Sequence, residues 1–212
     1  MGEGGAVVCD SPELRRIVLS LRDWGRDCWC APGHDDTCHK RYEQKFPLLP
    51  AGYDHKYVYS HLGYNLKITD MQAAVGLTQL SRLAEFGAAR RRNFARLAKA
   101  LAPLDGGALI LPKATPRSDP SWFGFPITLA EGSDRRALLE HLNARRIGTR
   151  LLFAGNITRQ PCFAGVEHRV AGSLAGTDAI MRRTFWVGTY PGLDEARVDF
   201  IAASILEWFS GR

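Results

Sequence analysis

A long run of apolar residues at helical spacing most constrains how this chain can fold. The run covers residues 68–101 and consists of Ile68, Met71, Val75, Leu83, Phe86, Phe94, Leu97 and Leu101. Thr69 and Gln72 stand three apart, as in a capping box, so a helix is predicted to begin there. Such a helix exceeds the ordinary length of roughly 8–20 residues, and Gly87 is a candidate kink. A helix this long commonly bridges two domains or joins two subunits.

The region after Pro103 alternates short strands with helices. Strands are predicted at residues 109–111, 123–129, 149–153 and 185–187. Helices are predicted at residues 133–145, 177–183 and from Asp194 to near the C-terminus. Residues 103–212 are therefore expected to form a compact α+β domain.

The front of the chain lacks this regularity. Residues 6–9 resemble a strand, and Asp10 or Ser11 can cap a helix that has Pro12 at its first position. The periodicity then vanishes from Gly25 to about residue 59. One strand, one helix and a long loop cannot enclose a core. We therefore expect residues 1–60 to be the remnant of a larger domain and residues 61–102 to be a helical region between domains.

Composition and charge exclude several classes of protein. The chain has 212 residues, of which 45% are hydrophobic and 24% charged, as in ordinary globular proteins. No apolar run approaches the roughly 20 residues that cross a bilayer, and the start has no secretion leader, so we expect a cytoplasmic protein without membrane contact. The net charge of +6 fits a small anionic substrate. No nucleic-acid-binding motif is present, so no nucleic-acid partner is expected.

Three of the five cysteines lie close together, at Cys28, Cys30 and Cys38. Thiolates suit soft metals and iron–sulfur clusters, and an intervening Pro-Gly turn could fold the third cysteine back onto the first two. A zinc site would need four ligands, which these cysteines could provide together with His34 or His39. An iron–sulfur cluster also needs four ligands, usually all cysteine. The spacing does not decide between zinc and iron, and three unrelated loop cysteines are the third interpretation.

A second candidate site follows the strand predicted at residues 149–153. Arg150 and Asn156 lie there, and an arginine near an amide can bind a carboxylate or a phosphate. A surface arginine beside a turn asparagine is equally compatible with the pattern. No Ser/His/Asp or paired-carboxylate arrangement stands out, so no catalytic residue is assigned.

Several segments together resemble a known family. Residues 63–74, Gly-Tyr-Asn-Leu-Lys-Ile-Thr-Asp-Met-Gln-Ala-Ala, resemble the hallmark segment of the DegT/DnrJ/EryC1/StrS sugar aminotransferase family. The cysteine loop, residues 121–127 and residues 149–156 are similar to its CDP-4-keto-6-deoxyglucose 3-dehydrase branch. The resemblance covers nearly the whole chain. It implies the C-terminal portion of an α/β, fold-type I PLP-dependent transferase, with a remnant of the large domain and a small α+β C-terminal domain.

The resemblance also implies a chemistry. Enzymes of this branch use pyridoxamine or pyridoxal 5'-phosphate to remove the C3 hydroxyl of CDP-4-keto-6-deoxyglucose, a step in making 3,6-dideoxyhexoses for lipopolysaccharide O-antigen. A 2Fe–2S cluster relays electrons from a flavin and iron–sulfur reductase, and the enzyme is a homodimer with shared active sites. A zinc-stapled interaction module without catalysis and a sugar aminotransferase of the same family are the alternatives.

The resemblance assigns roles by position. Asn65 matches the residue that reaches the cofactor phosphate of the neighbouring subunit, and Arg150 and Asn156 lie in a motif on the substrate side. The cysteines that match cluster ligands are Cys28, Cys30 and Cys38. The family's catalytic histidine, its cofactor-ring contacts and a fourth cluster cysteine would lie upstream of this sequence. We therefore expect the 212 residues alone to be catalytically inactive.

Overall fold

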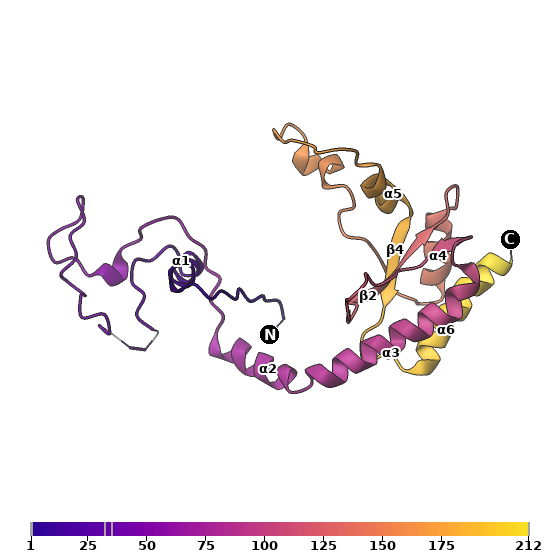
Figure 1. Cartoon of the computed structure of the whole chain (residues 1–212), viewed down its shortest axis with the longest axis horizontal. Coiled ribbons are helices and arrows are strands. Elements are labelled where there is room, and N and C mark those ends of the chain that lie inside the picture. Colours follow the sequence, from indigo (N-terminus) through magenta and orange to yellow (C-terminus); the bar gives the residue numbers. More distant parts are fainter. Residues whose placement is uncertain (1, 32, 35, 212) are drawn as a thin grey trace. The chain divides into compact units, whose positions relative to one another are not determined.

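A computed structural model describes residues 2–31, 33–34 and 36–211. The chain forms two compact units, Met1–Ser81 and Arg82–Arg212, called unit 1 and unit 2 below (Figure 1). Their boundary falls inside the helical region predicted at residues 61–102. The assignment of residues 1–60, 61–102 and 103–212 to three segments stays a prediction.

Two helices occupy the region where one long helix was predicted. They are α2 (Asp70–Leu80) and α3 (Leu83–Leu101). The predicted capping box at the start of α2 is confirmed, because Thr69 and Gln72 each accept a hydrogen bond from the other's backbone N–H. At the end of α2, the Ser81 hydroxyl donates to the carbonyl of Thr78 at 2.8 Å and competes with helical hydrogen bonding there. The prediction of one continuous helix, kinked at Gly87, is therefore wrong.

Unit 2 is built on a four-stranded antiparallel sheet with strand order β1-β2-β4-β3. Its strands are β1 (Leu109–Ile110), β2 (Gly124–Leu129), β3 (Thr149–Leu151) and β4 (Thr184–Gly188). Phe125 lies opposite Val187, and Ile127 lies opposite Phe185. All four side chains are fully buried, as expected where alternate residues of a strand face a core.

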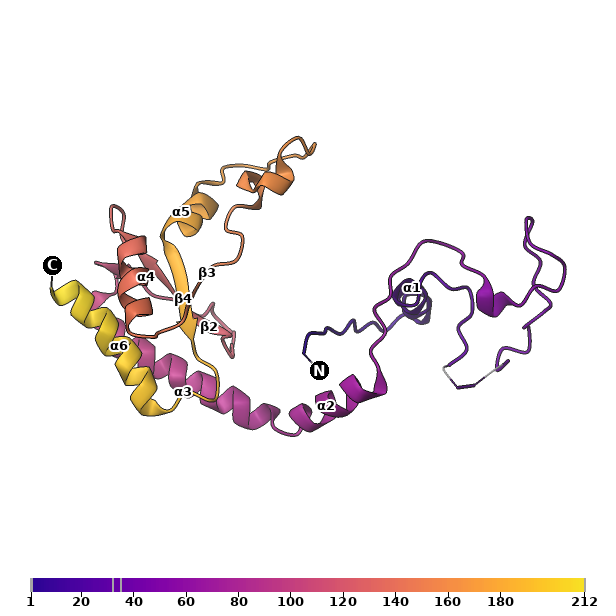
Figure 2. The same ribbon diagram turned by 180° about the vertical axis from the view of Figure 1, so that it is seen from behind.

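Helices cover the face of the sheet that carries these residues. The covering helices are α3, α4 (Arg135–Ala144) and α6 (Glu195–Ser210), and α3 lies beside α6 in both views (Figures 1 and 2). Asp194 caps α6 as predicted, whereas Asp134 rather than Ser133 caps α4. The remaining helix, α5 (Ala175–Arg183), leads directly into β4. The helical side chains of the core are Leu97, Leu101, Leu138, Leu142, Val198, Ile201, Ala202 and Ile205.

Unit 1 has much less regular structure. Its first helix, α1 (Pro12–Arg22), begins as predicted, with Ser11 as the cap and Pro12 at the first position. The predicted strand at residues 6–9 is wrong, because this segment belongs to no sheet within the described residues, and Val7 and Val8 are 73% and 91% exposed. None of the helices in the described part of the chain is long and apolar enough to cross a membrane.

Backbone pairing between residues 21–27 and 58–66, called the loop base below, closes the cysteine loop. Trp24 donates its N–H to Tyr64 at 2.8 Å, and Asp27 donates its N–H to Val58 at 2.9 Å. Gly25 is required in this pairing, since its φ is +84° and a Cβ would lie 1.9 Å from the carbonyl oxygen of His61. The loop base therefore holds together the two ends of residues 28–57.

Candidate functional site

The three predicted metal-ligating cysteines lie together in unit 1. All three are free thiols and partly buried, and the Cys30 thiol is within hydrogen-bonding reach of both Cys28 and Cys38. Burial raises the pKa of the Cys28 thiol. The pKa of Cys30 is lowered to about 7, chiefly because the Thr37 side chain hydrogen-bonds to its sulfur. The loop therefore gathers three sulfurs, one of which ionises readily.

The donor chemistry of the loop fits a thiolate-bound metal, because three neighbouring sulfurs suit soft metal ions. In the positions that the described side chains occupy, no group of three or more Cys, His, Asp or Glu residues could hold a metal ion. A 2Fe–2S cluster usually takes four cysteine ligands, and this loop provides three. Metal binding by this loop would therefore require the sulfurs to move onto a common centre and one more ligand.

The imidazole that contacts one of the thiols, that of Cys38, is His55, which sequence reasoning missed. His55 is only 1% exposed, and its Nε2 lies 3.2 Å from the sulfur of Cys38. By contrast, His34 and His39, the two predicted alternatives, are exposed. His55 stands 17 residues after Cys38, and no short spacing pattern joins the two. Only the closure of the loop brings them together.

A small cavity of about 80 Å³ lies beside the thiols. Cys28, Cys30 and His55 line it together with charged side chains of both signs, including Arg26 and Asp54. Small-molecule sites commonly measure roughly 300–1,000 Å³, so this cavity is too small for a nucleotide sugar. The cavity beside the cysteine loop is therefore not a pocket for such a substrate.

Asn65, the predicted cofactor contact, lies near the end of the loop base, shortly before α2. Its backbone forms an isolated antiparallel bridge with Asp23, and its side chain is exposed. An exposed amide in this position is free to contact a group outside unit 1. Its contact with a cofactor phosphate stays a prediction.

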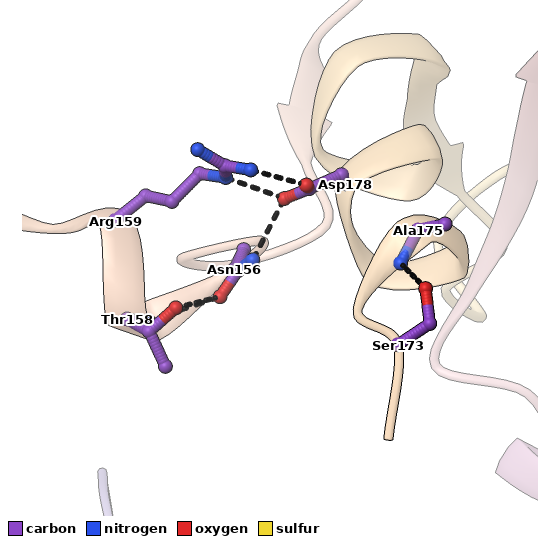
Figure 3. Close-up of polar contacts among 6 residues, drawn as sticks. All are labelled: Asn156, Thr158, Arg159, Ser173, Ala175 and Asp178. Carbon is purple, nitrogen blue, oxygen red and sulfur yellow. Dashed lines mark hydrogen bonds and ion pairs between the residues drawn. The ribbon is translucent and has the colours of Figure 1, made fainter. Parts of the chain in front are cut away.

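The two predicted substrate residues have different surroundings in unit 2. Arg150 is exposed on β3, where its guanidinium donates to the carbonyl of Thr149 at 2.9 Å. Asn156 is 2% exposed, and its amide donates to Asp178 at 2.7 Å while its oxygen accepts from the backbone and hydroxyl of Thr158 (Figure 3). Arg150 can therefore meet a ligand directly, whereas the Asn156 amide is engaged within the protein.

Asp178 joins the loop after β3 to α5. It accepts two hydrogen bonds from the guanidinium of Arg159, at 2.6 and 2.5 Å, in addition to the one from Asn156 (Figure 3). These hydrogen bonds, that of Arg159 first, hold the pKa of the Asp178 carboxyl well below its usual range. No sequence pattern indicated this ion pair. It fixes the loop that carries Asn156 against α5.

Comparison with known proteins places these features in a family context. The model of the DegT/DnrJ/EryC1/StrS aminotransferase family matches residues 1–206. The chain is 58% identical over 211 residues to the lipopolysaccharide biosynthesis protein RfbH of Salmonella typhimurium, covering 99% of this chain and 48% of that protein. It is 56% identical over 209 residues to a dTDP-4-dehydro-2,6-dideoxy-D-glucose 3-dehydratase of Saccharopolyspora spinosa, covering 98% of this chain and 45% of that protein. The chain thus spans about half the length of these curated relatives.

More distant relatives include a transaminase and several solved structures. A dTDP-3-amino-3,4,6-trideoxy-alpha-D-glucose transaminase of Streptomyces venezuelae is 27% identical over 207 residues, covering 98% of this chain and 46% of that protein. The crystal structure of S. venezuelae DesV with a ketimine intermediate matches with a TM-score of 0.72 at 25% identity, over 95% of this chain and 45% of that one. A GDP-4-keto-6-deoxymannose-3-dehydratase, ColD, matches with a TM-score of 0.75 at 21% identity, over 93% of this chain and 49% of that one. The fold is therefore that of the C-terminal portion of an α/β, fold-type I PLP-dependent transferase.

Proposed function

Because the chain belongs to the DegT/DnrJ/EryC1/StrS aminotransferase family, we propose that it forms part of a vitamin B6-dependent nucleotide-sugar 3-dehydratase. The observation that carries this proposal is the identity of 56–58%, over nearly the whole chain, to a named 3-dehydratase and to a lipopolysaccharide biosynthesis protein. The identity of 27% to a transaminase is weaker support for the aminotransferase alternative. The proposed substrate is CDP-4-keto-6-deoxyglucose, which would lose its C3 hydroxyl on the way to a 3,6-dideoxyhexose.

Exposed polar side chains of both units would bind cofactor and substrate. When bound, pyridoxamine 5'-phosphate would supply the amine that condenses with the C4 ketone of the sugar. Asn65, with its exposed amide, would donate to the cofactor phosphate of a neighbouring subunit. Arg150 would bind a phosphate of the nucleotide sugar through its exposed guanidinium. Asn156 would act on the substrate side by fixing its loop, since its amide is held by Asp178 and Thr158.

The thiols of Cys28, Cys30 and Cys38 would hold a 2Fe–2S cluster, together with one further cysteine. Their mutual proximity and the lowered pKa of Cys30 support this assignment. A flavin and iron–sulfur reductase would deliver the electrons. The reductase, the homodimer and the cytoplasmic location stay predictions.

Anaerobic reconstitution with ferrous iron and sulfide tests the proposed centre. With a small thiol in the buffer to supply the fourth ligand, we expect the chain to take up iron and sulfide, to absorb visible light and to give a paramagnetic signal after reduction. The variant with Cys28→Ser, Cys30→Ser and Cys38→Ser should lose all three signals. Cys162→Ser is the matched control, because Cys162 is an exposed free thiol in unit 2, outside the cysteine loop.

Two results would contradict this assignment. Full iron uptake by the triple variant would show that these thiols are not the ligands. Stoichiometric, colourless zinc held by the same three thiols, without iron, would instead support the zinc-stapled module.

The substrate assignment has its own test, equilibrium binding of the CDP-sugar. We expect Arg150→Ala to weaken binding about 10–150-fold, because a hydrogen bond to a charged group contributes roughly 1.5–3 kcal/mol. Arg136→Ala is the control, since Arg136 is 87% exposed on α4 and pairs with Glu140. Equal affinity of the Arg150→Ala and Arg136→Ala variants would contradict a role for Arg150 in substrate binding.

A further inference from the structure

A second cavity, called the unit 2 cavity below, lies beside the start of α6. Its volume is about 730 Å³, within the roughly 300–1,000 Å³ that small-molecule sites commonly measure. Its walls come from the turn between α4 and β3, the segment between β4 and α6, and α6 itself. None of its described lining residues is among those proposed above to bind cofactor, substrate or metal. It is therefore a cavity of ligand size to which no role has been assigned.

The apolar part of the lining combines a buried floor with two exposed aromatic rings. Ile147 and Ile201 line the cavity and belong to the core of unit 2. Tyr190 and Phe200 line it as well, but they are 55% and 50% exposed. Within the described residues, neither ring stacks on another aromatic ring. A flat apolar ligand would cover ring surface that is otherwise left in water.

The charged part of the lining has one positive charge in excess. Its charged residues are Arg146, Arg197 and Asp194. Arg197 forms an ion pair with Asp194, which also caps α6. The exposed guanidinium of Arg146 has no ion-pair or hydrogen-bond partner within the described part of the chain. The cavity therefore offers one unbalanced cation, which suits a ligand with a single negative charge.

Arg146 also occupies a backbone position that favours glycine. It follows the end of α4, and its φ is +60°. Its N–H donates to the carbonyl of Asn143 at 2.9 Å, and the N–H of Ile147 donates to the carbonyl of Leu142 at 3.0 Å, which together form a Schellman motif. Glycine is the usual residue at this point of the motif, because a Cβ strains the left-handed backbone. An arginine held there despite the strain indicates a use for its side chain.

Contacts with α3 and α6 fix the segments that carry these side chains. The amide of Asn93, which is 6% exposed on α3, donates to three carbonyls of the segment that carries Tyr190. Arg145, the neighbour of Arg146, forms an ion pair with Glu207 of α6. The cavity is therefore formed before a ligand arrives, so binding would need little ordering of the chain.

We propose that the unit 2 cavity binds a small aromatic carboxylate. The ring would lie against Tyr190 and Phe200, and the carboxylate would accept two hydrogen bonds from the guanidinium of Arg146. A phosphate monoester fits less well, because it carries about 1.5–2 negative charges and the cavity has one unbalanced cation. This inference stands independently of the function proposed above.

Titration of 2-naphthoate into the full chain, followed by NMR, tests the proposal. We expect the backbone amides of Gly148 and Gly188, which line the cavity, to shift until saturation. Arg146→Gly should weaken binding at least about tenfold, because hydrogen bonds between charged groups are lost. The same variant should melt about 2–6 °C higher, because glycine relieves the strained φ. Its weaker binding can then not be attributed to unfolding.

Two matched variants control for strain and for the loss of a ring. Arg117→Gly should change the affinity less than about twofold, because Arg117 is also an exposed arginine of unit 2 with a positive φ, +64°, but does not line the cavity. Phe200→Ala should weaken binding about 3–10-fold through the lost ring contact. Phe153→Ala, at an exposed ring outside the cavity, should leave the affinity unchanged.

The neutral alcohol 2-naphthalenemethanol separates the contribution of charge from that of the ring. It should bind the unsubstituted chain at least about tenfold more weakly than 2-naphthoate does, with an affinity that Arg146→Gly leaves unchanged. Equal affinity of the two compounds would overturn the proposal, as would equal affinity of the Arg146→Gly and Arg117→Gly variants for 2-naphthoate. Binding that leaves the amides of Gly148 and Gly188 unshifted would place the ligand elsewhere and overturn it as well.

Discussion

The two units of the chain are stabilised in different ways. In unit 2, one face of the sheet and three helices enclose a continuous apolar core, in which Phe125 and Phe185 are fully buried. In unit 1, the loop base, a buried imidazole and partly buried thiols take the place of such a core. Unit 2 can therefore form by burying apolar surface, whereas unit 1 depends on backbone pairing and polar contacts around the cysteine loop.

The largest expected effect is on the core of unit 2. Phe185→Ala should lower the free energy of unfolding of this unit by about 3–5 kcal/mol, because truncation of a buried phenylalanine leaves a cavity. Thermal unfolding followed by circular dichroism measures the loss. Phe153→Ala is the control, since Phe153 is 80% exposed in the same unit. Similar losses in the two variants would mean that the core described here does not stabilise unit 2.

A smaller effect is expected from a glycine of the loop base. Gly25→Ala should open the pairing, because the new Cβ would collide with the carbonyl of His61. Hydrogen exchange should then accelerate at the amides of Trp24 and Ser60. Gly52→Ala is the matched control, since Gly52 also has a positive φ, +73°, but has open space around it, and strain of this kind costs about 1–3 kcal/mol. Equal exchange rates in both variants would show that strain, not the close approach, accounts for the effect.

The smallest effect concerns the ion pair between Asp178 and Arg159. The pKa of Asp178 is lowered in the folded protein, so its stabilisation is present above the ordinary carboxyl pKa of about 3.9. That stabilisation is lost as the pH falls from this value through the lower, folded pKa. In this interval the unfolded chain binds a proton that the folded chain does not. Asp178→Asn should therefore lower the melting temperature at pH 6 but flatten its decline below about pH 4.

A matched variant checks this pH dependence. Asp119→Asn removes a carboxylate that is 84% exposed and paired with Arg91, so its melting profile should follow that of the unsubstituted chain. If the Asp178→Asn variant shows the same acid decline as the unsubstituted chain, the ion pair does not contribute as described.

Local patterns predicted the regular elements well. The alternation around Phe125 and the capping residues Ser11, Thr69 and Asp194 placed strands and helix ends within a few residues, because these signals act over one or two turns. The strand predicted at residues 6–9 was wrong, since an apolar run without a pairing partner forms no sheet. The break after α2 was missed because the apolar spacing continues across it. The hydrogen bond of the Ser81 hydroxyl to the carbonyl of Thr78 leaves no mark in that spacing.

The candidate sites were predictable only in part. The three cysteines stand close in sequence, so their proximity could be anticipated. His55 and Asp178 could not, because each is defined by contacts that the closed loops create, across 17 residues to Cys38 and 22 residues to Asn156. The sequence instead indicated histidines near the cysteines, such as His34, as candidate ligands, and the structure shows His34 to be exposed.

Hydrogen exchange with and without metal tests the central claim most directly, namely that unit 1 is organised around its thiols. The chain would be measured before and after anaerobic reconstitution with iron and sulfide. We expect the amides of the loop base and of the cysteine loop to exchange more slowly once metal is bound, with no change in the sheet of unit 2. Unchanged exchange throughout unit 1, despite bound iron, would contradict this account.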